Sequence, residues 1–241
     1  MSTPQPAASS RQNRGQAMVE FLIIIPVLIL LIFGALQATL IYSAKSGLNY
    51  AAFQAARLGA VNNAQYEGMR RGLLRGMYPM FSQYPEATRM DKTAEEVDNF
   101  VLITRISPAL NSFNAWQAPH VGLLSSGQTA QAIPNDNLMY RSAQQNPVSI
   151  QDANLLKIRV QYCVKLIVPM VEHLLSRASK FNQRQSGGSF SENSKQSWDQ
   201  YTAICGARKG FVLTAEATVR MQSAAVHDAA NCGAGKKMLC P

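Results

Sequence analysis

The sequence lacks the short motifs by which common catalytic sites are recognised. It contains no HExxH, no paired CxxC, no phosphate-binding P-loop and no GxSxG. Only 3 of its 241 residues are histidine. We therefore predict that the protein is not an enzyme, and that it needs no cofactor and no metal ion.

Charged residues are nearly absent from the N-terminal part of the chain. Between Arg14 and Lys45 the one charged residue is Glu20, and the apolar stretch 21–42 follows it. A helix of that length extends about 33 Å, close to the thickness of a bilayer's hydrocarbon core. A carboxylate in that core costs up to about 2.5–3.5 kcal/mol, so we expect Glu20 to have a function.

The apolar stretch could be a cleaved secretory signal or a retained membrane anchor. It is longer than the apolar core of a signal peptide, about 7–15 residues. No small-x-small cleavage site followed by a polar segment stands at its end; the nearest match, 35–38, is followed by further apolar residues. The sequence therefore favours a retained, single-pass anchor in a lipid bilayer.

Cysteine is absent from the whole chain before Cys163, and this bears on orientation. Arg11 and Arg14 on one side of the anchor balance Lys45 and Arg57 on the other, so basic residues do not decide. All four cysteines follow the anchor and are even in number, which suggests an oxidising compartment. We expect a cytoplasmic N-terminus and a C-terminal domain outside the cytoplasmic membrane.

Helical patterns continue beyond the anchor. Residues 44–61 carry an Ala-rich stripe at helical spacing, and Asn62-Asn63 is a plausible stop. A second helix is predicted over 65–78. Its glycines recur every fourth residue, which indicates either a close-packing face or a weak helix (Gly68, Gly72, Gly76).

The rest of the chain predicts a small antiparallel sheet. Two segments, 156–166 and 211–222, alternate apolar and polar residues as half-buried strands do. As neighbours they would bring Glu216 to Lys157 or Arg159. The remaining segments are predicted as a strand at 100–106, loops over 117–153, a short helix at 168–176 and a mobile loop at 177–197.

The cysteines leave three disulfide connectivities open. Cys163 and Cys205 flank the same loop region and are the first pairing we expect. Cys232 and Cys240 could join His227 and Asp228 in a zinc site, but their spacing matches no familiar zinc pattern, and a short disulfide loop is the favoured interpretation.

The loop 177–197 is basic and holds Phe181 and Phe190, with Trp198 beyond it. Aromatic residues among cations are typical of grooves that bind single-stranded nucleic acid. A solvated loop has the same composition, and we favour it, so no nucleic-acid partner is predicted.

The run Arg14-Gly15-Gln16-Ala17-Met18-Val19-Glu20-Phe21, followed by Pro26 and the Ala-rich segment 49–60, resembles the TadE-like pseudopilins of tight-adherence (type IVc) pilus systems. The resemblance covers about residues 14–60. Less specifically, 133–138 and the two late strands also look like that family.

The resemblance implies cleavage by a prepilin peptidase between Gly15 and Gln16. Gln16 becomes the mature N-terminus and Glu20 its fifth residue, where the carboxylate meets the terminal amine of a neighbouring subunit and sets the register between packed helices. Other pilin subunits and the assembly platform are the implied partners. Pro26 is expected to kink the helix.

The sequence thus predicts an α+β protein with three parts: a leader at 1–15, a hydrophobic helix at 16–61 and an extracytoplasmic domain at 62–241. The size of the domain favours a minor subunit that assists pilus assembly over a major pilin. Two other functions stay open: an uncleaved membrane protein with a periplasmic binding domain, and a pilus-tip adhesin or DNA-binding subunit.

Overall fold

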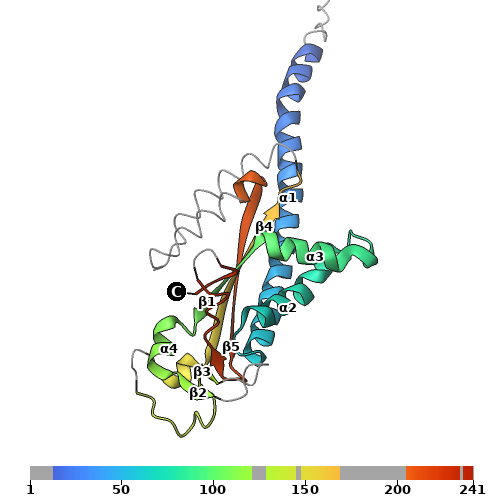
Figure 1. Cartoon of the computed structure of the whole chain (residues 1–241). Helices are drawn as coiled ribbons and strands as arrows, with labels where there is room; N and C mark the ends of the chain where they lie inside the picture. Colours follow the sequence, from blue (N-terminus) through green and yellow to red (C-terminus); the bar gives the residue numbers. More distant parts are fainter. Residues whose placement is uncertain (1–12, 121–128, 145–147, 169–204, 234–235, 241) are drawn as a thin grey trace, which may run out of the picture.

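The computed structural model describes residues 13–120, 129–144, 148–168, 205–233 and 236–240. A long N-terminal helix leads into a small domain of sheets and short helices, which confirms the expected α+β class (Figure 1). Apart from Val168, the predicted short helix at 168–176 lies outside the described residues, as do the predicted mobile loop 177–197 and the aromatic residues near it.

Helix α1 spans Asn13–Val61 and continues through Pro26. Its N-terminal half stands clear of the domain, and its C-terminal half packs against it (Figure 1). The predicted continuation over 44–61 is confirmed. The helix ends before Asn63 and Ala64, whose φ angles of 54° and 55° are left-handed and turn the chain. The kink at Pro26 stays a prediction.

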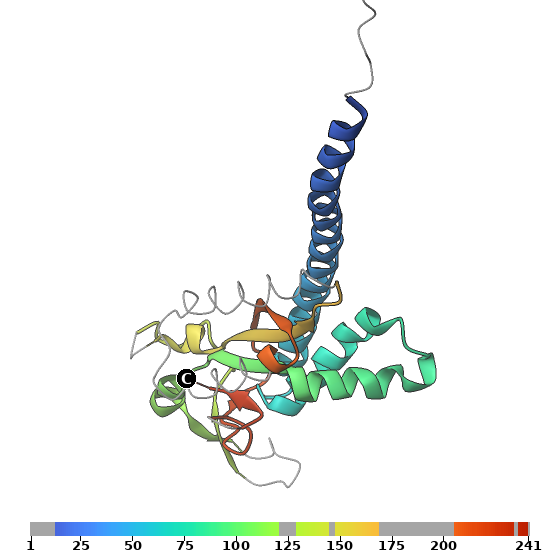
Figure 2. The ribbon, with the colours of Figure 1, turned by 90° about the horizontal axis from the view of Figure 1, so that it is seen from above.

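Helix α2 (Tyr66–Met77) returns along α1 in the opposite direction, and the short 3-10 helix η1 (Tyr78–Phe81) follows it. Helix α3 (Glu86–Phe100) was not predicted from the sequence. Helix α3 and the turn before it project sideways from the domain as an arm (Figure 2). Only Thr93 and Val97 of α3 are buried, so its sequence shows no broad apolar stripe.

The main sheet has the strand order β5-β4-β1-β7. The strands β1 (Val101–Ser107), β4 (Leu155–Lys165) and β5 (Gly210–Arg220) are antiparallel neighbours, as predicted for the last two, and the short β7 (Met238–Leu239) runs parallel to β1. Arg159 pairs with Glu216 across β4 and β5. Their side chains form an ion pair of 2.6 Å, and Lys157 lies 3.3 Å from the same carboxylate, which confirms the expected contact.

A second, smaller sheet corrects the prediction of loops over 117–153. It contains β2 (Ala118–His120), β3 (Ala130–Ile133) and β6 (Ala225–Val226), with the short helices α4 (Leu110–Trp116) and α5 (Ile150–Ala153) beside it. These strands are too short to show an alternation of their own. Strand β3 finds its partner β6 late in the chain, which no local pattern can reveal.

The core lies between the sheet and the C-terminal half of α1. Leu48 and the alanines of α1 are fully buried there, together with alternate residues of β4 and β5. Lys45 Nζ donates to the carbonyl oxygen of Thr214 and ties α1 to β5. The second half of α1 is thus part of the domain, whereas most of the described side chains in its first half are exposed.

Candidate functional site at the N-terminal helix

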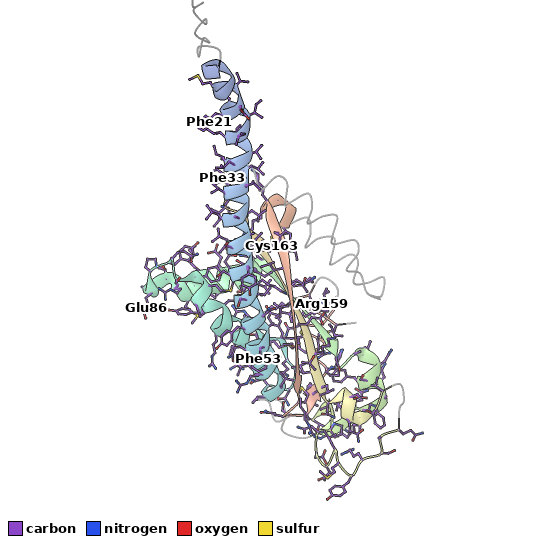
Figure 3. All side chains as sticks on the ribbon, turned by 180° about the vertical axis from the view of Figure 1, so that it is seen from behind. Phe21, Phe33, Phe53, Glu86, Arg159 and Cys163 are labelled. Atoms are coloured by element: carbon purple, nitrogen blue, oxygen red, sulfur yellow. A yellow bond between two sulfur atoms is a disulfide. The ribbon has the colours of Figure 1, made fainter. Side chains whose placement is uncertain are left out.

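The residues expected at the processing site lie at the start of α1. Gly15 and Gln16 fall in its first turns, and Glu20 follows about one turn later. The carboxylate of Glu20 is exposed. The described side chains around Glu20, 18–24, are exposed as well, so no described part of the domain covers this end of the helix (Figure 3).

The helix after Glu20 exposes apolar side chains on every face. Phe21 and Phe33, labelled in Figure 3, mark this bare part of α1. A soluble helix would bury one of its faces, whereas a helix that is apolar all round suits lipid or other apolar helices. The part of the chain described by the structure contains one helix long and apolar enough to cross a membrane, and this is it. The large apolar side chains more than 40 % exposed are Met18, Val19, Phe21, Leu22, Ile23, Ile24, Val27, Leu28, Ile29, Leu30, Leu31, Ile32, Leu36 and Leu40.

Comparison with known families bears on this same segment. Residues 15–57 match the model of the TadE-like protein family. The N-terminal segment is TadE-like. The match begins at Gly15 and includes Glu20 and Pro26, which confirms the resemblance seen in the sequence. Comparisons with curated proteins and with solved structures found no match for the chain.

The TadE-like segment has two structural parts. Its first part is the bare apolar helix, and its last part, 48–57, packs into the domain. There Ala51 and Ala55 face the glycines of α2. A Cβ on Gly72 would lie 2.5 Å from the Cα of Ala55, and one on Gly76 would collide with Ala51. The glycines therefore form a close-packing face, the first of the two interpretations that the sequence left open.

Two disulfides hold the domain. Cys163 of β4 bonds to Cys205, and Cys232 bonds to Cys240, with Cα–Cα distances of 5.6 and 5.5 Å. This is the pairing favoured from the sequence. The first disulfide joins the ends of the segment between β4 and β5, and the second closes the tail that carries β7. Disulfides of this kind suit an oxidising compartment.

The residues of the imagined zinc site have other partners. The Asp228 carboxylate accepts a hydrogen bond from the backbone N of Tyr66 at 3.2 Å, at the start of α2. His227 packs edge-on against Phe113, and burial lowers the pKa of His227, with the nearby charge of Arg105 as a second cause. Among the described residues no group of three metal-ligating side chains comes together.

Two charged groups of the domain were not foreseen from the sequence. Glu96 of α3 forms a bidentate ion pair with Arg208, both bonds 2.7 Å, and also accepts from the hydroxyl of Tyr162. Burial and then the charge of Glu96 raise the pKa of Tyr162. This cluster joins the base of the α3 arm to strand β4 beside the first disulfide.

Arg105 is the second unforeseen group. It is fully buried on β1, and none of its guanidinium nitrogens has a hydrogen-bond partner among the described residues. Its charge lies 4.9 Å from the ring centre of Phe113. Burial lowers the pKa of Arg105 to about 10, and the charge of Asp228 opposes this change. Arg105 lies inside the domain, on β1, and has no contact with the N-terminal site among the described residues.

Proposed function

We propose that this chain is a minor pilin or pseudopilin that assists the assembly of a tight-adherence (type IVc) pilus. A prepilin peptidase removes residues 1–15 at the cytoplasmic face of the inner membrane. The mature helix holds the protein in the membrane as a single-pass anchor, and the domain after 61 stands in the periplasm or outside the cell. The protein acts by binding other subunits and the assembly platform, and not as an enzyme.

One observation carries the proposal: the TadE-like segment presents one exposed carboxylate, Glu20, at the start of a bare apolar helix. In a low dielectric a lone carboxylate is costly, and so is a lone terminal amine, whereas the two together are favourable. A subunit whose Gln16 amine meets the Glu20 of its neighbour satisfies both charges. The pair also fixes how far one helix slides along the next.

The domain supports a minor role in the filament. It contains two disulfides and a projecting arm. A major pilin, which forms the filament through its helix, would not require a domain of this size. The disulfides also support the proposed orientation, because they form outside the cytoplasm. The assignment to a minor subunit rests on the size of the domain and on analogy with other pilins.

The proposal is tested with Glu20→Ala in cells that assemble the pilus. We expect normal processing, because the cut lies five residues away, and loss of pili from the cell surface. Glu86→Ala is the matched control, since Glu86 is likewise an exposed glutamate near the start of a helix, here the first turn of α3. Wild-type piliation by Glu20→Ala would rule out the assembly role.

A further inference from the structure

Among the residues of α1 whose burial is described, Gln37 is the first buried one along the chain, and it lies inside the apolar stretch. The side chain of Gln37 is only 2 % exposed, and its Oε1 accepts a hydrogen bond of 3.0 Å from the backbone N of Val168. The end of β4 and the start of β5 point along α1 toward its N-terminal half (Figure 1). This end of the sheet therefore lies beside the middle of the helix.

The contact at Gln37 fixes how deep α1 can sit in a bilayer. The bare part from Met18 to Leu36 extends about 28 Å, against about 30 Å for the hydrocarbon core. Residues 166–168 lie beyond the last residue of β4 that pairs with β5. If the hydrocarbon core of the bilayer extended as far as Tyr42, the backbone of these residues would lie in hydrocarbon. Unsatisfied backbone groups are too costly there. The bilayer core therefore ends at about Gln37, short of Tyr42.

The side chains around this contact suit the surface of a bilayer. Ile167 is 72 % exposed, and Lys165 and Lys209 at the same end of the β4–β5 pair are exposed as well. An apolar side chain flanked by lysines matches the boundary between acyl chains and anionic headgroups. Tyr42, 77 % exposed, then falls in the headgroup layer, where tyrosine is enriched.

We propose that the end of β4 rests on the bilayer, with Ile167 in the acyl boundary and Lys165 and Lys209 among the lipid phosphates. The helix already holds this surface at the membrane, so weak contacts are enough to keep it there. The domain thereby has a fixed orientation: the end of the main sheet at Lys165 faces the bilayer, and the second sheet lies away from it. The inference rests on the proposed insertion of α1, and not on the pilus role.

A fluorescent probe on a single cysteine tests this proposal. The four native cysteines form two disulfides, so Ile167→Cys adds the one thiol that a nitrobenzoxadiazole label can modify. The full chain is placed in vesicles of phosphatidylcholine with some phosphatidylglycerol, with or without a nitroxide on the acyl chain near the headgroup. Leu36→Cys reports on the helix. Met139→Cys is the matched control, since Met139 is 88 % exposed in the loop after β3, at the far end of the domain (Figure 1).

We expect the label at 167 to be blue-shifted and quenched at least about half as strongly as the label at 36, and the label at 139 not to be quenched. Lys165→Cys serves as a second probe if a cysteine at 167 disturbs the fold, with quenching expected there too. A label at 167 that behaves like the one at 139, while the label at 36 is quenched, would overturn the inference. Failure of the label at 36 to be quenched would overturn it together with the insertion of α1, but would not test the pilus role.

Discussion

Gly72→Ala should destabilise the domain although alanine is the better helix former. The added Cβ would stand 2.5 Å from the Cα of Ala55 and from the carbonyl oxygen of Gln54, both backbone atoms of α1. No change of rotamer relieves a contact with backbone, so α2 must move away from α1. Overpacking of this kind costs about 1–3 kcal/mol. The change from Gly to Ala in a helix returns up to about 1 kcal/mol.

We predict a net loss of about 1 kcal/mol for Gly72→Ala, or about 2–4 °C in the melting temperature of a domain of this size. Denaturation of the full chain in detergent measures it, with Trp116 fluorescence as a probe, because its indole N donates to Val148 inside the domain. Gly34→Ala is the control, since nothing lies within 4 Å of its added Cβ. Equal stability of Gly72→Ala and Gly34→Ala would refute the close contact of α1 and α2.

The charged groups of the domain yield three further predictions. Glu96→Gln should lower the free energy of unfolding by about 1–3 kcal/mol, because it removes a charge from the half-buried ion pair with Arg208. Glu95→Gln is the control: Glu95 is the neighbouring residue but is exposed, so the same denaturation experiment should show no measurable effect. Arg105→Met should raise the free energy of unfolding by about 1–3 kcal/mol, because it removes a buried charge that has no hydrogen-bond partner among the described residues. A variant less stable than the wild type would contradict this prediction. His227 has a pKa below its ordinary value of about 6.5 in the folded state, so the unfolded chain takes up the proton first and stability should fall as pH decreases below about 6.5. His227→Gln should flatten that pH dependence, and an unchanged slope would show that His227 is not its source.

The sequence predicted the elements whose own pattern carries the information. Helix α1 is marked by a long apolar stretch and an alanine stripe, and the strands β4 and β5 by regular alternation, and the predicted bounds of all three came within about three residues. Helix α3 was missed because it buries only two residues. The strands β2, β3 and β6 were missed because they are too short to show a pattern, and because β3 pairs with β6 from far along the chain. A local sequence pattern does not predict elements that depend on tertiary contacts for their stability.

The sequence alone predicts more of the candidate site than of the domain. Gly15, Gln16 and Glu20 are recognisable from their order and spacing before an apolar stretch. The structure was needed to show that the alanines of the same segment lie under the α2 glycines, and that the domain reaches the helix at Gln37. The buried Arg105 has no signal in the sequence, because a cation in a strand is ordinarily taken to face solvent.

The N-terminal residue of the protein purified from its native membrane tests the central claim most directly. Edman sequencing or the mass of the N-terminal peptide gives it, and Gly15→Val provides the comparison, because it removes the small residue at the expected cut. A prepilin-like subunit must begin at Gln16 in the wild type and keep its leader in the variant. A wild-type chain that keeps residues 1–15 would contradict this account and would make the protein an uncleaved membrane anchor.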